Sequence, residues 1–365
     1  MAKSKIKVGV IGAGNCFAGL YQGLQYYKKH KLNEAAGLMH PILGGYKLSD
    51  IEFVSAFDVA DNKVGRNLNE AVYAKPNAVN WLEPKAMPPT SVTVQESPVL
   101  DGLGIYVLDR VHPVKNKPLD ILTRDIKKHI EETDTRILLC YLPVGSQKAV
   151  EYWAKMALDT HCAMVNCLPV FIASNPLWAA RFKQAGLPIV GDDIKAQVGS
   201  TIVHRTLAKL VDDRGAAIDT TYQINVGGNT DFLNMKEQSR LTSKKISKTS
   251  SVQSNLRKPL ADDKIYIGPS DFIPFLSNKK LGFMRIEGRM WADVPFNMEI
   301  RLEVDDKANS GGVSVDAIRC AQIALDRGQS GMLEGPSAYF MKHPPVQYAD
   351  PVARQMVEDF IKGKA

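Results

Sequence analysis

The chain has 365 residues, enough for two domains or for one large domain with an insertion. Hydrophobic residues make up 45% and charged residues 23%, so the chain can bury a sizeable core without disulfides. Five cysteines at irregular spacing predict free thiols in a reducing compartment. The sequence shows no signal-peptide pattern and no apolar run long enough to cross a bilayer, so we expect a cytoplasmic protein without a membrane partner.

The net charge of +7 raises the question of a nucleic-acid partner. The basic excess is concentrated between residues 236 and 264, a segment with few aromatic side chains that could stack on bases. We therefore expect no nucleic acid to bind. A solvated face and a phosphate pocket both remain open as explanations of the excess.

The first elements follow the order of a dinucleotide-binding βαβ unit. Residues 5–11 predict a buried strand that ends in glycines, and residues 17–29 predict a helix. After an irregular, glycine-rich insertion at 33–47, a second strand at 51–57 ends in Asp58. The insertion places Asp58 much further behind Gly14 than the usual spacing of about 20 residues.

Strands and helices then alternate up to residue 200. After a proline-rich surface excursion at 75–118, helices are predicted at 121–131, 151–158 and 176–185, with strands at 135–141, 162–166 and 187–190. This alternation predicts an α/β fold with a Rossmann-type, doubly wound parallel sheet covered on both faces.

The pattern changes beyond residue 200. A helix at 201–211, a strand at 217–226 and a polar, basic segment at 235–258 are followed by alternating strands at 281–287 and 294–304. These predict a second α+β domain with an open, largely antiparallel sheet. Tail helices at 313–326 and 351–361 are expected to return to the first domain. The predicted domains are therefore 1–200 plus 311–365 for NAD binding, and 201–310 for catalysis and oligomerisation.

The glycine turn carries the first chemical signal. Gly12 and Gly14 let backbone N–H groups approach a pyrophosphate at a helix N-terminus, where Asn15 and Cys16 add donors. A tight turn that needs glycine for steric reasons alone is the competing interpretation. Asp58 would bind a ribose hydroxyl and repel a 2′-phosphate, which favours NAD over NADP; its alternative role is a helix cap.

Polar loops follow several later strands, at 141–146, 166–171 and 191–195. Ligands of doubly wound sheets bind at the carboxyl ends of strands, although ordinary turns can have the same composition. The sharpest of these signals is the pair Asp192 and Asp193, since adjacent acids at a strand end often hold a ribose, a cation or a lysine.

Two lysines further on have a spacing that matters. Lys244 and Lys248 are four residues apart, so on a helix they would share one face and repel each other unless an anion lies between them. Neighbouring hydroxyl residues suit a phosphate cradle. Close cations would also lower a lysine pKa, which proton transfer can use.

In these segments the chain resembles the 1L-myo-inositol-1-phosphate synthases, in particular their shorter bacterial and archaeal form. The matching motifs run over nearly the whole chain: GAGNC (12–16), GLMH (37–40), FDV (57–59), YLPVG (141–145), LPVFIAS (168–174), GDDIK (191–195), NVGGN (225–229), DFLN (231–234), SKKISKT (243–249) and IGPSD (267–271). One departure is that the longer eukaryotic synthases carry extra lysines after the Gly-Asp-Asp turn, where this chain has residues 199–204 without lysine. Roles of those lysines are not carried over.

The resemblance implies that NAD serves the isomerisation of D-glucose 6-phosphate to 1D-myo-inositol 3-phosphate. The implied steps are oxidation at C5, enolisation, intramolecular aldol closure and reduction at C5. Fixed cations would stabilise the oxyanions that form. The implied catalytic residues are Lys244, Lys248, Lys280, Asp193, Asn225, Asp231 and Asp306, with Asp305 an alternative to Asp306. The implied cofactor-binding residues are Gly12, Gly14, Asn15, Cys16, Asp58, Gly145, Ser146, Pro169, Asp193, Ala196, Asp231 and Lys244.

The family likeness also implies a homotetramer built through the second sheet. No metal-ligand cluster is evident, although a phosphate-rich site near Asp193 could take a divalent or monovalent cation. Two other functions stay open: a net NAD-dependent dehydrogenase of the two-domain homoserine or amino-acid type, and a non-enzymatic NAD-sensing or nucleic-acid-binding protein. The first would release NADH, and the second would turn nothing over.

Overall fold

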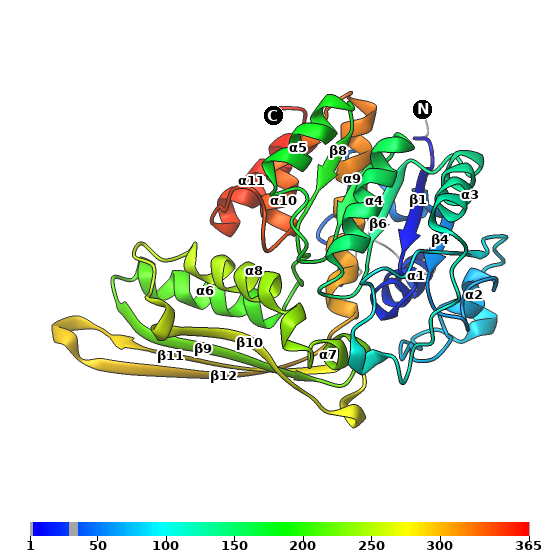
Figure 1. Ribbon diagram of the computed structural model, residues 1–365. Helices are drawn as coiled ribbons and strands as arrows, with labels where there is room; N and C mark the ends of the chain where they lie inside the picture. The colour runs from blue at the N-terminus through cyan, green and yellow to red at the C-terminus, as the bar shows by residue number, and fades with distance from the viewer. Residues whose placement is uncertain (1–2, 29–35, 365) are drawn as a thin grey trace.

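The computed structural model describes residues 3–28 and 36–364. Its larger layer is a seven-stranded sheet in the order β13-β8-β7-β6-β1-β4-β5, in which all the pairs are parallel (Figure 1). The strands are β1 (Ile6–Ile11), β4 (Ile51–Asp58), β5 (Val94–Glu96), β6 (Ile137–Cys140), β7 (Ala163–Asn166), β8 (Pro188–Val190) and β13 (Gly331–Met332). The predicted Rossmann-type sheet is confirmed.

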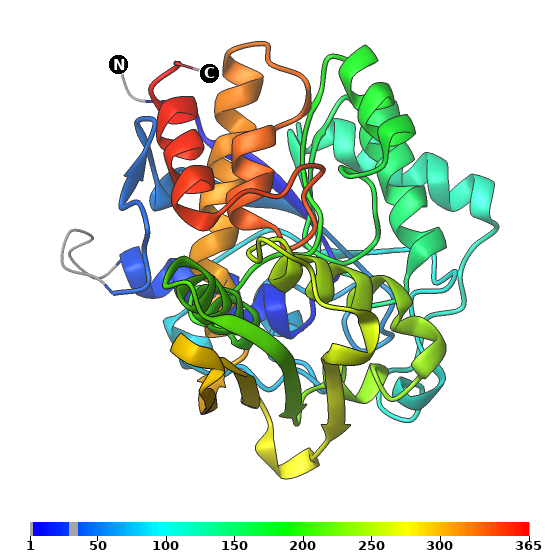
Figure 2. The same ribbon diagram turned by 90° about the vertical axis from the view of Figure 1, so that its left-hand side faces the viewer.

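Helices bury both faces of this sheet, as Figure 2 shows. Strand β6 illustrates why its sequence is apolar throughout: Ile137 and Leu139 belong to one core, and Leu138 and Cys140 belong to the other. One face carries α1 (Asn15–Lys28), α9 (Ala308–Asp326) and α11 (Asp350–Ile361). The opposite face carries α3 (Leu119–Glu132), α4 (Gln147–Asp159) and α5 (Pro176–Gln184).

The tail helices pack on the first sheet, as expected. Helix α9 contacts α1 and the strands β6, β7 and β8, while the short α10 (Glu334–Phe340) joins α9 to α11. The exact domain boundaries remain predictions.

The second layer is a four-stranded sheet that extends away from the first (Figure 1). Its order is β10-β9-β11-β12, with bounds β9 (Ala217–Gly227), β10 (Ile265–Phe272), β11 (Lys279–Arg289) and β12 (Pro295–Asp305). Strand β11 pairs antiparallel with both neighbours, which confirms the largely antiparallel sheet, whereas β10 lies parallel to β9. Helices α6 (Ser200–Asp213) and α8 (Thr242–Gln253) pack on this sheet through Ala208, Val252, Ile265 and Ile267.

The excursion at 75–118 was predicted to lie on the surface, and this is wrong for part of it. Strand β5 extends the parallel sheet beside β4, and Val79, Val94 and Val107 are buried. A strand of three residues between prolines shows too little alternation to be recognised in the sequence. Residues 29–35, which include the end of the first predicted helix and the start of the predicted insertion, lie outside the described residues. The insertion continues as a hairpin of β2 (Ile42–Leu43) and β3 (Tyr46–Lys47), and α2 (Leu68–Ala71) follows β4.

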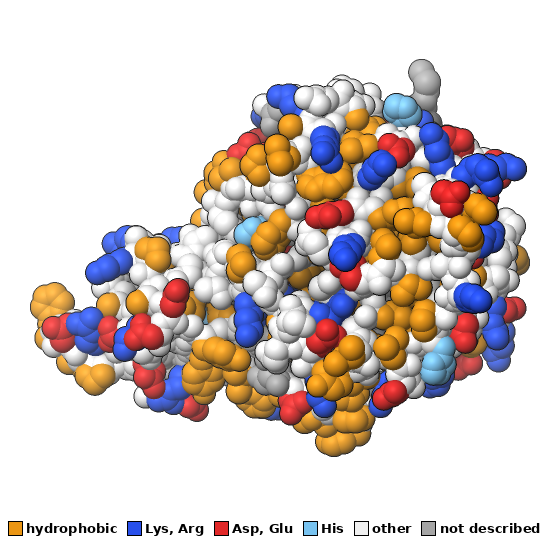
Figure 3. Space-filling view, viewed as in Figure 1, with side chains coloured by type: hydrophobic (Ala, Val, Ile, Leu, Met, Phe, Trp, Pro, Cys, Tyr) orange, Lys and Arg blue, Asp and Glu red, His pale blue; other side chains and the backbone are white. Residues whose placement is uncertain are grey.

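Among the described residues, no helix is both long enough and apolar enough to cross a membrane. On the face that Figure 3 shows, basic and acidic side chains are interspersed rather than segregated. The net charge is therefore not gathered into one basic patch on that face.

Candidate active site

The glycine turn after β1 contains two glycines that are needed for different structural reasons. Gly12 has φ +92, and a Cβ there would lie 2.8 Å from the Tyr141 carbonyl oxygen. Gly12 is therefore required by the backbone itself. At Gly14 an added Cβ would meet no described atom within 4 Å. The space over Gly14 is left open at the start of α1, which is where a dinucleotide pyrophosphate would need the backbone to be bare.

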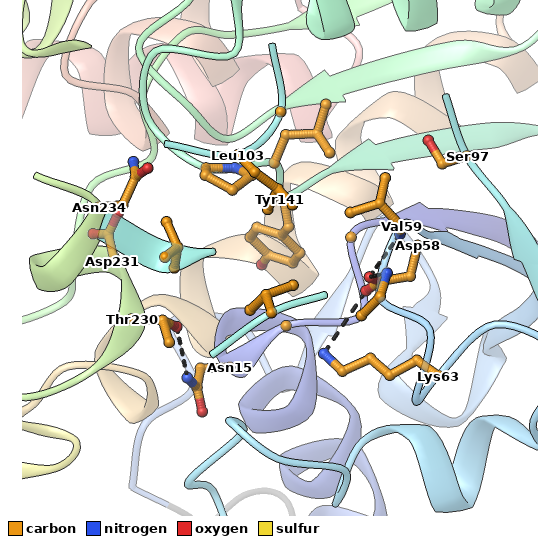
Figure 4. Close-up of a pocket in the computed structure, with 18 of the residues that line it drawn as sticks. Asn15, Asp58, Val59, Lys63, Ser97, Leu103, Tyr141, Thr230, Asp231 and Asn234 are labelled. Carbon is orange, nitrogen blue, oxygen red and sulfur yellow. Dashed lines mark hydrogen bonds and ion pairs between the residues drawn. The ribbon is translucent and has the colours of Figure 1, made fainter. Parts of the chain in front are cut away.

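Asp58, at the end of β4, holds this turn in place. Its carboxylate accepts hydrogen bonds from the backbone N–H of Ala13 at 2.8 Å, of Val59 at 2.8 Å and of Ala60 at 3.0 Å. The buried Lys63 lies 3.8 Å from the same carboxylate (Figure 4). Asp58 thus fixes the glycine turn through hydrogen bonds and does not cap a helix. Its side chain also lines the cavity beside the turn.

This first cavity encloses about 990 Å³, measured out to its open mouth. Its floor is the glycine turn and its roof is the 97–111 part of the excursion. The short helix α7 (Thr230–Asn234) closes it from the second layer through Thr230, Asp231 and Asn234 (Figure 4). Asn15 links the two layers, since its amide accepts from Ala78 N–H at 2.7 Å and donates to Thr230 Oγ1 at 3.4 Å.

A second cavity of about 880 Å³ continues from the first. The two share Cys16, Tyr141, Leu142, Asp231 and Lys307. Six lysines but only three aspartates line the second cavity: Lys195, Lys244, Lys248, Lys280, Lys307 and Lys342 against Asp193, Asp231 and Asp306. A concave site with this excess of cations suits a small anionic molecule.

The predicted lysines come together because of helical and strand geometry. Lys244 and Lys248 share the inward face of α8 and are buried, whereas Lys245 between them is exposed. Part of the basic segment is therefore the wall of a pocket and not a solvated face. Lys280 reaches the same cavity from the start of β11.

Carboxylates hold most of these ammonium groups. Lys244 Nζ lies 3.3 Å from Asp231, and Lys342 Nζ lies 2.9 Å from Asp193. Asp306 binds two lysines, with Nζ of Lys280 at 3.2 Å and Nζ of Lys307 at 2.9 Å. Within the described residues, Lys248 Nζ has neither a hydrogen bond nor an ion pair.

The pKa values differ between the groups that have an ion-pair partner and Lys248, which has none among the described residues. Burial, together with the charges of Lys244, Lys280 and Lys342, lowers the pKa of Lys248 well below 10.5. Burial acts to raise the pKa of Asp306, but Lys280 and Lys307 more than offset it and hold this pKa well below 3.8. For Asp231 burial is likewise outweighed, by Lys244 and Lys307, and its pKa is lowered. Burial, together with the charge of Arg205, also lowers the pKa of Lys195, in the same wall, to about 7. The site therefore holds Asp231 and Asp306 as carboxylates and contains two lysines, Lys248 and Lys195, that lose a proton more easily than an ordinary lysine.

Most of the residues proposed from the sequence line the two cavities: Gly12, Gly14, Asn15, Cys16, Asp58, Pro169, Asp193, Ala196, Asp231, Lys244, Lys248, Lys280 and Asp306. The choice between the two acids falls on Asp306, because the Asp305 carboxylate accepts from the backbone N–H groups of Lys307 and Ala308 and begins α9.

Three residues lie elsewhere. Asn225 is buried in β9, donating to the Gly268 carbonyl at 3.1 Å, and is not part of either cavity wall. Gly145 and Ser146 lie beneath Arg240, whose side chain would be 2.6 Å from a Cβ on Gly145. Their assigned roles remain predictions without a contact to the cavities.

Sequence reasoning missed Lys63, Lys195, Lys307 and Lys342. Lys195 ends the matched motif at 191–195 but was not assigned a role. The other three lie outside the matched motifs, so only the tertiary contacts bring them to the site. One available signal was the position of Lys307, directly behind the acid at a strand end. Asp192 plays a different part from Asp193: it accepts N–H bonds from Ile172, Ala173 and Ser174, and thus fixes a loop.

The described residues contain no group of three or more His, Cys, Asp or Glu placed to hold a metal ion. The cation allowed for in the sequence analysis thus has no ligand set there.

Comparison with known proteins shows the family to which the chain belongs. The profile of the myo-inositol-1-phosphate synthase family matches residues 199–307, which include α6, α8 and the second sheet. The chain is 50% identical to the inositol-3-phosphate synthase of Mycolicibacterium smegmatis, over 98% of both chains. It is 46% identical to that of Corynebacterium glutamicum, over 99% of both.

Among solved structures, the inositol-3-phosphate synthase of Caenorhabditis elegans shares the fold with a TM-score of 0.75 at 15% identity, covering 100% of this chain and 86% of that one. A myo-inositol-1-phosphate synthase-related protein of Thermotoga maritima has a TM-score of 0.79 at 22% identity, covering 98% of both. The relatives at 46% and 50% identity show that the chain belongs to the myo-inositol-1-phosphate synthase family, as its sequence predicted, and is an isomerase-type enzyme of that family.

Proposed function

We propose that this enzyme converts D-glucose 6-phosphate to 1D-myo-inositol 3-phosphate with a bound NAD that is regenerated in each cycle. The observation that carries the proposal is the lysine-rich cavity opening directly into the cavity over the glycine turn, with Asp231 and Lys307 in the wall common to both. A sugar phosphate in the second cavity would lie next to the reactive end of a dinucleotide in the first.

The residues of the first cavity suit NAD. The bare backbone at Gly14 and the start of α1 would accept its diphosphate, and Asp58 lies where an adenosine ribose would bind. When bound, NAD supplies the oxidation at C5 of the sugar and its later reversal. No side chain of the protein needs to change its oxidation state.

The lysines provide the remaining chemistry. Lys244 and Lys280, each fixed by a carboxylate, stabilise the negative charge that develops on the sugar oxygens and bind the phosphate. Lys248 is suited to remove a proton from C6, because its lowered pKa leaves more of the neutral amine at neutral pH than an ordinary lysine has. The resulting enolate closes on the C1 aldehyde while the carboxylates keep the lysines in place.

The test is to incubate the purified protein with glucose 6-phosphate and NAD, with and without added Mg²⁺ or K⁺. Inositol phosphate is followed by phosphorus NMR and NADH by absorbance. We expect inositol phosphate without net NADH. Steady accumulation of NADH would instead identify a dehydrogenase, and no turnover under any of these conditions would refute the proposal.

We further propose a cytoplasmic homotetramer that uses the open face of the second sheet. Support comes from the alternating exposed residues of β12, from Trp291, which is 92% exposed in the turn before it, and from the five free cysteines. Light scattering of the wild type and of Trp291→Glu tests the assembly. A monomeric wild type would contradict it.

A further inference from the structure

Lys307 occupies a position that the proposed mechanism has not used. It lies between the end of β12 and the start of α9, and it is 3% exposed. It belongs to the wall of both cavities. Burying an ammonium group in this way is costly unless anions surround it.

The contacts of Lys307 leave part of its ammonium free to bind. Its Nζ donates to Asp306 Oδ2 at 2.9 Å and lies 3.6 Å from the Cys16 sulfur, which is a weak acceptor. Cys16 is the second residue of α1, directly after the glycine turn. An ammonium has three protons, so at least one points to neither a carboxylate nor a carbonyl among the described residues.

The other lysine of the first cavity is already occupied. Lys63 Nζ donates to the Ala13 carbonyl at 2.9 Å and to Asn77 Oδ1 at 3.2 Å, and it lies 3.8 Å from Asp58. Lys63 thus has two oxygen acceptors and a longer ion pair, whereas Lys307 has one oxygen acceptor, the carboxylate of Asp306. Of the two lysines lining this cavity in the described chain, Lys307 has the fewer oxygen partners.

Asp306 keeps Lys307 charged and positioned. Burial would lower the pKa of Lys307, but Asp306, Cys16 and Asp231 together raise it, so the side chain stays an ammonium at neutral pH. Asp306 also accepts from Lys280 and, at 3.1 Å, from Asn229 Nδ2, which anchors the carboxylate itself. The result is a fixed cation beside the N-terminus of α1.

We propose that Lys307 binds the diphosphate of the dinucleotide, adding a charge-assisted hydrogen bond to the backbone donors of α1; this rests on the proposed use of NAD. A diphosphate carries two negative charges, whereas the backbone amides offer only partial positive charge. Asp231, an acid in the same wall, is itself paired with Lys244.

The experiment compares dissociation constants, measured by calorimetry, of NAD, ADP-ribose and adenosine for the wild type and Lys307→Met. NAD and ADP-ribose should each bind about tenfold more weakly or worse, which is the loss of one charge-assisted hydrogen bond, while adenosine is unaffected. Lys307→Arg should restore most of the affinity. The matched control is Lys280→Met, which removes the other lysine of Asp306 from outside the first cavity and should change NAD affinity less than about twofold.

Unchanged binding of ADP-ribose by a folded Lys307→Met would overturn the assignment, and so would an equal loss for adenosine. A loss confined to NAD would place Lys307 at the nicotinamide instead and refute it too. If that variant does not fold, Lys307→Gln, whose amide can still donate to Asp306, is measured in its place. A wild type that does not bind NAD at all would sink the proposed function itself, which separates the two failures.

Discussion

Replacing Lys248 by methionine keeps the length of the side chain and removes its ammonium group. Lys248 is 5% exposed and, in the described structure, has no carboxylate paired with it, while Lys244, Lys280 and Lys342 surround it. The charged form of Lys248 therefore destabilises the fold of the enzyme without substrate. It contributes to activity only when an oxyanion or a transferable proton is present. The substitution should consequently lower activity and raise stability together.

The loss of one preorganised donor or proton-transfer group predicts a fall in kcat of about 10²- to 10³-fold. Removing a buried charge without a partner should stabilise the fold by about 1–3 kcal/mol. With an unfolding entropy of roughly 2.1 cal/mol/K per residue, this corresponds for 365 residues to a Tm about 1–4 °C higher.

The sign of the pH dependence follows from the lowered pKa of Lys248. Below the ordinary lysine pKa of 10.5 the unfolded chain binds this proton more strongly than the folded one, so Lys248 costs stability there. The Tm advantage of Lys248→Met should be full below the lowered pKa of Lys248 in the folded protein, and it should shrink as the pH rises from there towards 10.5. In the wild type, kcat should rise with pH through the lowered pKa, and this limb should vanish from any residual activity of the variant.

The assays are phosphorus NMR for turnover and calorimetric unfolding for Tm, with NAD binding as a check of the first cavity. Lys245→Met is the matched control, since Lys245 is the exposed neighbour on the same helix and should change neither quantity noticeably. Near-normal turnover of Lys248→Met would remove Lys248 from the chemistry. A Tm that falls would show that the ammonium is stabilised by something other than the described residues, and the reasoning would fail.

Three further predictions concern the first cavity and the C-terminal helix. Gly14→Val should leave the Tm of the cofactor-free protein nearly unchanged but weaken NAD at least tenfold in calorimetry, whereas Gly12→Val should already destabilise the fold; equal Tm losses would contradict this division. Asp58→Ala should weaken NAD and lower Tm, because the glycine turn loses its acceptor as well as the ribose partner; unchanged cofactor occupancy would reduce Asp58 to a structural role. A hydrogen bond to Asp316 raises the pKa of His40 above 6.5 despite partial burial, with Glu358 adding to the effect. The stabilisation is therefore complete below pH 6.5 and lost as pH rises through the folded pKa, so Tm should fall over that range in the wild type and not in His40→Gln.

Local chemistry determined much of this protein from the sequence alone. Strand β1, the glycine turn and helix α1 follow one another within a short stretch, and the spacing of Lys244 and Lys248 already gave their common helical face. Continuous apolar runs such as Ile137–Cys140 indicated a sheet buried on both sides. The resemblance added the family and therefore the chemistry.

The tertiary structure decided which distant groups face one another. Lys307 and Lys342 reach the site from the beginning of α9 and from the segment after α10, and neither has a local pattern that distinguishes it from a surface lysine. Asp306 was separated from Asp305 only by the direction in which each carboxylate points. Gly145 and Asn225 matched their motifs, and Ser146 follows one directly, but all three lie outside the cavity walls. A motif specifies residue types, whereas packing specifies which of them are exposed to a ligand. Pairing between lysines and acids is long-range electrostatics, which residue spacing along the chain does not encode.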